Sequence, residues 1–100
     1  MKENDEFLPI GSVVLLKEAT RKIVIIGFAG MEEGSKKMWD YIGCAYPIGM
    51  VSSEKNLLFN KDQIEKVVSV GYSDDEDKKF RSVLASSLLQ RLIFFWYSSF

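Results

Sequence analysis

The sequence contains no histidine and only one cysteine, Cys44, among its 100 residues. Without histidine, the chain cannot assemble a Ser-His-Asp triad, a Cys-His dyad or a zinc site built from cysteine and histidine. A lone cysteine also excludes an intramolecular disulfide, and an unpaired thiol fits a reducing compartment. These absences predict a protein that is not an enzyme and that uses no metal or cofactor.

The chain has neither a surplus of charge nor a long hydrophobic run. Its 13 Lys and Arg residues are balanced by 14 Asp and Glu residues, which gives a net charge of -1. Such a chain has no large positive field to attract phosphate backbones, so we expect no nucleic-acid partner. The longest apolar stretch, residues 92–97, is far shorter than the roughly 20 residues that span a bilayer. The polar, mostly acidic start of the chain lacks the pattern of a secretory signal, and we expect a cytoplasmic protein without a membrane span.

Hydrophobic residues, by contrast, make up 47% of the chain and aromatic residues 13%. This bulk is sufficient for the core of one small domain that covers residues 1–100. Runs rich in β-branched and apolar residues predict strands at 12–17, 22–28, 38–46, 56–59 and 66–72. Asn60 followed by Gln63 resembles a helix-start box, which predicts a single helical turn over residues 61–65.

The first two strand runs are apolar at nearly every position, where a half-exposed strand would alternate. Either both faces of these strands are covered, or the strands coil tightly around a small barrel. We therefore expect an α+β fold in which residues 7–72 form a small antiparallel β-barrel or sheet of about five strands, similar in size to an SH3-like barrel. Gly43, in the middle of the third strand, indicates a bulge, a bend or the close approach of another backbone.

Residues 73–97 are predicted to form one C-terminal amphipathic helix. Ser73 can cap its start, and the acidic residues 74–77 favour the positive end of the helix dipole. Apolar residues then recur with a spacing of four, and beyond Leu88 the apolar face becomes wider than the arc that a helix on a small domain can cover. An exposed apolar face of this kind marks a protein contact, because buried aromatic side chains dominate interfaces. The residues predicted to bind a partner are Phe80, Leu84, Leu88, Leu92, Phe95 and Trp96.

Two other interpretations of this helix remain open. Residues 92–100 could fold back and plug the barrel, or the helix could join two copies of the chain in a homo-oligomer. A membrane contact would need more cations beside the apolar face than Arg81 and Arg91, the two in the last 21 residues.

The acidic and glycine-rich motifs do not have the spacing of known ligand sites. The acidic residues 74–77 lack the alternating ligands, central glycine and distant glutamate of a calcium loop. Gly27, Gly30 and Gly34 do not enter a helix after a strand and do not precede the Lys-Ser/Thr pair of a phosphate loop. We interpret the acidic residues as helix-dipole complements and the glycines as part of a hairpin tip.

The remaining reactive and aromatic side chains also favour a structural role. Cys44 has no histidine base and apolar neighbours, so it is expected to be a buried small hydrophobe. Trp39, Tyr41 and Tyr46 could form a stacking face for single-stranded nucleic acid, but the chain has no surplus charge for the basic groove that this requires. If the chain were an enzyme, Asp40 and Tyr41 would be the best candidates for its chemistry.

Three segments together resemble a known family. They are Leu8–Leu16, Trp39–Gly49 and Phe59–Val67, followed by Gly71-Tyr72 and the acidic run. In combination, "LPIGSVV" and the Asp-Tyr-Ile-Gly-Cys string resemble a small family of Gram-positive bacterial proteins of unknown function, DUF4176, over residues 7–80. The apolar residues 92–100 lie outside the resemblance.

The resemblance implies a context for the protein. Members of that family are typically encoded near type VII secretion loci and their LXG toxins, and the family supplies no catalytic residues. The resemblance therefore implies a cytoplasmic accessory protein that binds a secreted toxin or a secretion component, as a chaperone-like or targeting factor for an LXG effector. The alternative is an immunity protein that neutralises a cognate toxin domain and presents the acidic residues 74–77 to it.

Overall fold

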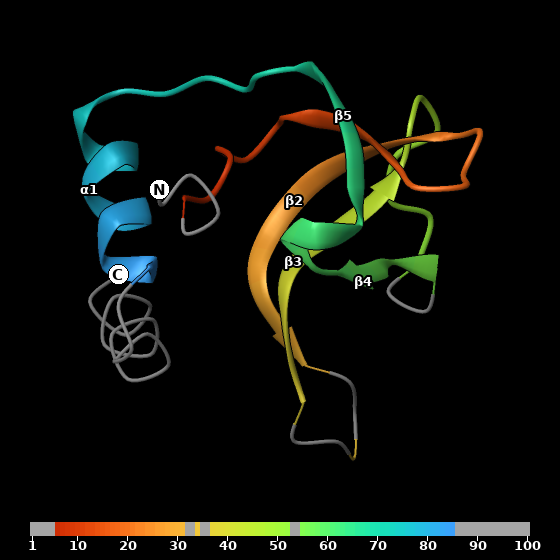
Figure 1. Ribbon diagram of the computed structural model, residues 1–100, viewed down its shortest axis with the longest axis horizontal. Coiled ribbons are helices and arrows are strands. Elements are labelled where there is room, and N and C mark those ends of the chain that lie inside the picture. Colours follow the sequence, from red (N-terminus) through yellow and green to blue (C-terminus); the bar gives the residue numbers. More distant parts are fainter. Residues whose placement is uncertain (1–5, 32–33, 35–36, 53–54, 86–100) are drawn as a thin grey trace.

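A computed structural model of the protein describes residues 6–31, 34, 37–52 and 55–85 (Figure 1). Over these residues the elements are β1 (Val13–Leu16), β2 (Lys22–Met31), β3 (Met38–Ala45), β4 (Leu57–Phe59), the 3-10 turn η3 (Lys61–Gln63), β5 (Ile64–Ser69) and α1 (Asp75–Leu84). The strands form one antiparallel five-stranded sheet in the order β4-β3-β2-β1-β5. The predicted α+β fold, with five strands and a C-terminal helix, is confirmed.

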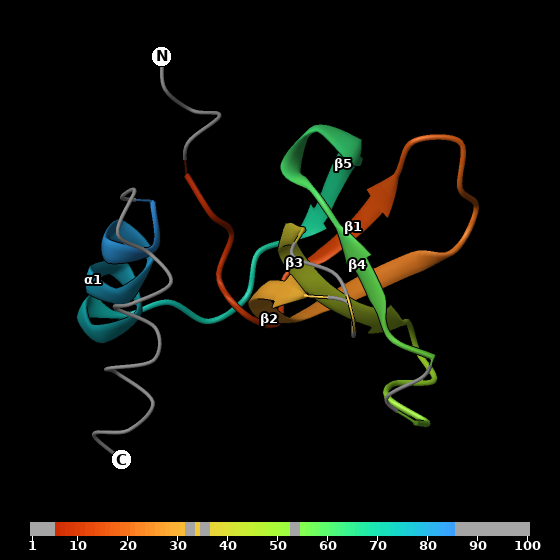
Figure 2. The ribbon, with the colours of Figure 1, turned by 90° about the horizontal axis from the view of Figure 1, so that it is seen from below.

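The sheet is open rather than closed into a barrel. In the described part of the chain, β4 and β5 form its two edges and do not pair with each other. Aromatic side chains connect the sheet with α1 and with the N-terminal segment, residues 6–12. Phe7, which precedes β1, packs edge-on against Tyr41 of β3 with 5.6 Å between ring centroids and against Phe28 of β2 with 5.7 Å. Both views show the N-terminal segment lying between α1 and the sheet (Figures 1 and 2).

The core lies between this N-terminal segment, the sheet and α1. Tyr41 and Phe59 are cross-strand neighbours in the β3–β4 pair, and their rings stack with 5.3 Å between centroids. Full burial of a large apolar side chain contributes about 1.5–3 kcal/mol, so this group supplies most of the stabilisation of a small domain. Its buried members are Phe7, Val14, Ile23, Ile25, Tyr41, Phe59 and Leu84.

Gly43 marks a close approach inside the sheet, as the sequence predicts. It pairs with Ile25 of β2, and a Cβ at Gly43 would lie 2.5 Å from Ile23 Cγ2 and 3.0 Å from the backbone oxygen of Val24. A side chain at this position would therefore displace the neighbouring strand. The β2–β3 register also shifts between Ile25 and Gly27, and such a bulge increases the local twist.

The predicted element boundaries differ from the observed ones mainly at two strands. β2 runs to Met31, beyond the predicted end at Phe28, and β5 begins at Ile64 and ends at Ser69, whereas the sequence predicted 66–72. The predicted helical turn is η3, and the Asn60 N–H donates to Gln63 Oε1 at 2.8 Å, which confirms half of the predicted start box. The chain leaves the sheet after Ser69 because the Gly71 N–H donates to Ser12 Oγ at 3.0 Å instead of to a strand.

α1 is the C-terminal helix that the sequence predicts. Its cap is Asp74 and not the predicted Ser73, because Asp74 Oδ1 accepts from the Asp77 N–H at 2.9 Å; the first turn is acidic, as predicted. The predicted continuation of the helix to residue 97 lies outside the described residues. None of the helices among the described residues is long and apolar enough to cross a membrane.

Candidate functional site

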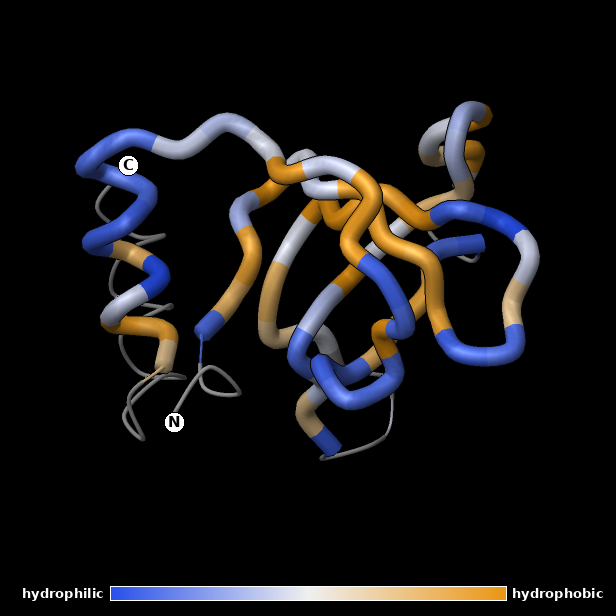
Figure 3. The backbone as a smooth tube through the Cα atoms, turned by 45° about the horizontal axis from the view of Figure 1, so that its top comes forward, coloured by the Kyte–Doolittle hydropathy of each residue, from blue (hydrophilic) through white to orange (hydrophobic). Residues whose placement is uncertain are grey.

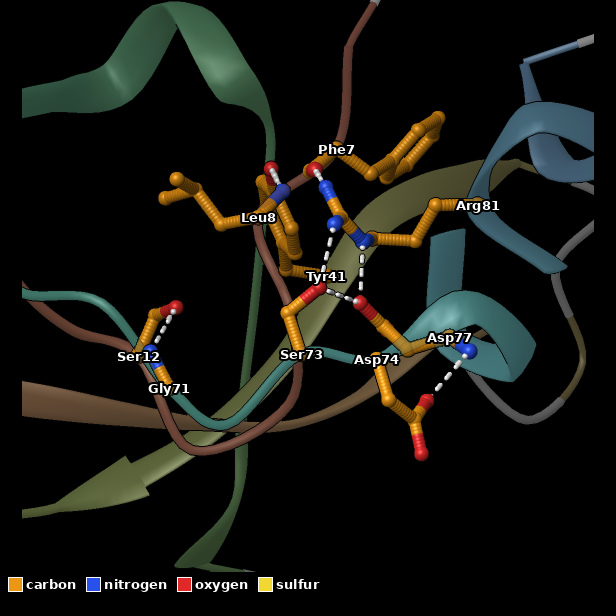
Figure 4. Close-up of polar contacts among 9 residues, drawn as sticks. All are labelled: Phe7, Leu8, Ser12, Tyr41, Gly71, Ser73, Asp74, Asp77 and Arg81. Atoms are coloured by element: carbon orange, nitrogen blue, oxygen red, sulfur yellow. Dashed lines mark hydrogen bonds and ion pairs between the residues drawn. The ribbon is translucent and has the colours of Figure 1, made fainter. Parts of the chain in front are cut away.

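The polar groups around α1 form one network that attaches the helix to the N-terminal segment (Figure 4). Arg81 Nε lies 2.9 Å from Asp77 Oδ2, its Nη1 donates to the Phe7 carbonyl at 2.6 Å, and its Nη2 donates to Ser73 Oγ at 3.1 Å. The Ser73 hydroxyl donates to Asp77 Oδ2 at 2.7 Å. These half-buried contacts therefore attach α1 to the N-terminal segment.

Tyr41 and Asp40, the best enzyme candidates in the sequence, also have structural partners. The Tyr41 side chain is buried, and its hydroxyl accepts from the Leu8 N–H at 2.9 Å. Burial raises the pKa of the Tyr41 hydroxyl above its ordinary value of 10.0, so the group stays protonated at neutral pH. Asp40 Oδ2 accepts from the Lys61 N–H at 2.8 Å, and the Asp40 N–H donates to Asn60 Oδ1 at 2.9 Å. These contacts join β3 to the N-terminal segment and to η3.

The prediction of a buried Cys44 is confirmed, whereas the assignment of Gly27 and Gly30 to a hairpin tip is wrong, because both lie within β2 and pair with β3. Cys44 is a free, buried cysteine. A Cβ at Gly30 would lie 2.6 Å from both Ile42 Cγ1 and Leu58 Cδ2, so this glycine makes room for packing within the sheet. Among the described residues, no group of three or more Cys, Asp or Glu side chains could hold a metal ion.

The three aromatic residues considered as a stacking face do not share one environment. Tyr41 is in the core, whereas Tyr46 is exposed and has Lys22 Nζ 5.2 Å from its ring centroid. Trp39 has Lys37 Nζ 4.0 Å from its ring centroid. Each cation covers one ring singly, and no continuous platform for bases is formed by these residues.

The predicted partner-binding residues fall into two groups. Leu84 is buried in the core, and Phe80 is half-buried with its ring 6.0 Å from that of Phe28. These two side chains therefore attach α1 to the sheet within the monomer. The remaining members of the set, Leu88, Leu92, Phe95 and Trp96, lie outside the described residues, and their partner role stays a prediction.

An exposed apolar region on β5 and its continuation was not singled out from the sequence. Val67 is 42% exposed and Val68 44%, and just beyond the strand Val70 and Tyr72 reach 63% and 80%. Ile10, which is also exposed, belongs to the same region because its carbonyl lies against the backbone of Gly71. We name Ile10, Val67, Val68, Val70 and Tyr72 the β5 surface.

The position of β5 explains why these side chains are exposed. β5 is an edge strand whose described partner is β1 alone, so its outer backbone edge is not covered by another strand. The β1–β5 register shifts twice, and one shift places Val68 as an extra residue between the pairs Val14–Val67 and Val13–Ser69. A bulge of this kind turns neighbouring side chains, and both Val67 and Val68 are accessible. The signal in the sequence was the run of valines without alternation at 67, 68 and 70.

Comparison with known proteins assigns the chain to a family. Residues 7–80 match the family model DUF4176, described as a domain of unknown function. The chain belongs to the DUF4176 family. The part of this DUF4176 protein that matches contains the N-terminal segment, the whole sheet, the β5 surface and the first turns of α1. No curated protein and no solved structure matches the chain.

Proposed function

We propose that this DUF4176 protein is a non-enzymatic accessory binding protein of the cytoplasm, which acts as a chaperone-like or targeting factor for an LXG-type effector of a type VII secretion system. The genomic context that the family resemblance implies supports the choice of partner. The observation that carries the binding function is the β5 surface, which lies within the residues that match the family.

Two physical properties make the β5 surface suitable for binding a protein. An edge strand presents unpaired N–H and C=O groups, which an extended segment of a partner can complete by adding a strand. The apolar side chains beside that edge provide burial at about 25 cal/mol per Å² of apolar area. An interface of standard size buries about 800 Å² on each partner, and apolar side chains at its centre supply most of the affinity.

The non-enzymatic part of the proposal is supported by the use of the polar residues. Tyr41 and Asp40 are hydrogen-bonded to the backbone of other segments, and Asp77 is paired with Arg81. The contacts that the structure gives these side chains are therefore contacts within the fold.

Co-purification with an LXG effector from the same locus tests the proposal. The effector is divided into its N-terminal export domain and its C-terminal toxic domain, and each is expressed with the full-length protein. We expect capture of the export domain. The variant Val70→Ser/Tyr72→Ser should weaken capture at least about tenfold, because it removes exposed apolar contacts of the kind that dominate interfaces.

The matched control is Ile48→Ser/Val51→Ser, which changes two side chains of similar exposure, 63% and 69%, outside the β5 surface. This variant should bind the export domain as the unmodified protein does. Capture of the toxic domain instead would identify an immunity protein. Capture of neither domain would contradict both functions.

A further inference from the structure

A second exposed apolar region lies on the loop that follows β3. In this loop Ile48 is 63% exposed, Met50 62% and Val51 69%, and Tyr46 is exposed at its start. We name these four residues the loop surface. The Gly49 N–H donates to the Ala45 carbonyl at 2.8 Å, so the backbone of the loop is a defined turn. The apolar side chains are therefore held out from the sheet by an ordered turn.

Cationic side chains flank the loop surface. Lys22 Nζ lies 5.2 Å from the Tyr46 ring centroid, and the Tyr46 N–H donates to the Lys22 carbonyl at 2.9 Å. Arg21 and Lys22, together with Tyr46 and Pro47, line a depression whose walls are mainly polar. Beyond the loop, the backbone N–H of Lys55 donates to the Ser52 carbonyl at 3.0 Å.

The loop surface and the cation-rich β1–β2 turn lie at the same end of the molecule. Figure 3 shows the loop that contains Val51 and the hydrophilic β1–β2 turn at one end, with α1 at the opposite end. The first turn of α1 is acidic, at Asp75, Glu76 and Asp77. Over residues 17–22 the cations Lys17, Arg21 and Lys22 outnumber the single anion Glu18, whereas the three acidic residues of α1 are balanced by three cations of the same helix, Lys78, Lys79 and Arg81. Such a charge distribution orients a protein toward a negative surface even when its net charge is small.

We propose that the loop surface binds the surface of an anionic lipid bilayer. The apolar tips of Ile48, Met50 and Val51 enter the boundary between headgroups and acyl chains, while Arg21 and Lys22 contact the lipid phosphates. Isolated apolar side chains on a turn with cations around them suit a flat interface that is apolar below and negative above. This site uses residues separate from the β5 surface and does not depend on the proposed function.

The interaction can be measured by co-sedimentation of the full-length protein with lipid vesicles. We expect binding to vesicles that contain phosphatidylglycerol and much weaker binding to vesicles of phosphatidylcholine alone. Raising the salt concentration from about 50 mM to about 500 mM should release most of the protein, because salt screens the attraction between the cations and the lipid phosphates. Ile48→Ser/Val51→Ser should reduce binding about tenfold. Lys22→Gln should reduce binding about fivefold, the effect of one cation near an anionic surface.

The matched control is Val70→Ser/Tyr72→Ser on the β5 surface, at positions that are 63% and 80% exposed. This variant should bind vesicles as the unmodified protein does. Because all the substituted side chains are exposed, a thermal melt should confirm that every variant folds. Absence of binding to anionic vesicles would overturn the proposal. The proposal would also be overturned if Ile48→Ser/Val51→Ser bound anionic vesicles as well as the unmodified protein does, or if the protein bound neutral and anionic vesicles equally. It would be overturned likewise if this variant lost binding to the protein partner but kept binding to vesicles.

Discussion

Tyr41 combines a hydrophobic and a polar role within one side chain. Its ring stacks on Phe59 and meets Phe7 edge-on, while its hydroxyl accepts from the Leu8 N–H. The ring thus binds the N-terminal segment through packing, and the hydroxyl fixes where that segment lies. Tyr41, which the sequence analysis considered as a candidate for enzyme chemistry, determines the position of the N-terminal segment.

Tyr41→Phe tests this role. The substitution keeps the ring and leaves the Leu8 N–H without its partner, so we expect a loss of about 1–3 kcal/mol in the free energy of unfolding. Urea unfolding followed by fluorescence or circular dichroism measures the change. A variant as stable as the unmodified protein would show that the hydroxyl does not stabilise the fold.

The same hydroxyl makes stability depend on alkaline pH. Burial raises the pKa of Tyr41 in the folded state above the value of 10.0 for an exposed tyrosine, so the folded state holds this proton more tightly than the unfolded state. The contribution is complete below pH 10.0 and is lost as the pH rises toward the folded-state pKa. Unfolding free energies measured across this range should fall more steeply for the unmodified protein than for Tyr41→Phe. Parallel curves would contradict the assignment.

α1 depends on one arginine for its attachment to the rest of the fold. Arg81 contacts Asp77, Ser73 and the Phe7 carbonyl, and its side chain is only 19% exposed. Arg81→Ala should destabilise the protein by about 1.5–3 kcal/mol, the range for hydrogen bonds to charged groups. Hydrogen exchange of the α1 amides should accelerate more than exchange in β2 and β3, because the helix is detached first.

Lys79→Ala is the matched control for this prediction, since Lys79 lies on the same helix and is exposed. It should leave both stability and exchange within experimental error. If the two variants had the same stability and exchange rates, the network around Arg81 would make no contribution to the free energy of unfolding.

The strands could be predicted because β-branched runs in this chain are bounded by glycine, proline and polar residues. What could not be predicted is where β5 stops. The strand pattern continues through Val70 to Tyr72, yet the Gly71 backbone leaves the sheet to pack against Ile10 and to donate to Ser12 Oγ. Tertiary contacts between distant segments therefore override local propensity at this point.

The β5 surface could not be predicted for a related reason. A run of valines is equally consistent with a central strand covered on both faces and with an edge strand. The order of the strands decides between these, and strand order is a property of the whole sheet. The charged residues Glu65 and Lys66 and the two bulges also protect this edge from indiscriminate pairing, which suits recognition of a particular segment.

At the scale of the whole molecule, the β5 surface and the loop surface are made of different residues on different elements. The loop surface follows β3, whereas the β5 surface continues toward α1. Partner and bilayer could therefore be bound at the same time without competing for side chains. The open sheet matters here because a closed barrel would leave no edge strand for a protein partner.

The predicted self-association through the C-terminal helix can be tested on the intact chain. Light scattering of the full-length protein is compared with a version that ends at Gln90. If the apolar residues beyond Gln90 join two copies, the full-length protein should have twice the monomer mass and the shorter version the monomer mass. If both versions had the monomer mass, these residues would not cause oligomerisation. They would then contact either a partner or the core of the monomer.

The bond from Arg81 to the Phe7 carbonyl has a consequence for biosynthesis, since it joins residues 74 positions apart. β5 must likewise reach back to β1 before the sheet is complete. A ribosome therefore has to translate almost the entire described chain before the Phe7 carbonyl meets its Arg81 partner, although Phe28 and Tyr41, which pack against the Phe7 ring, are made earlier. Assembly is delayed until synthesis is nearly finished, and a nascent chain stalled before β5 would expose the residues of the future core.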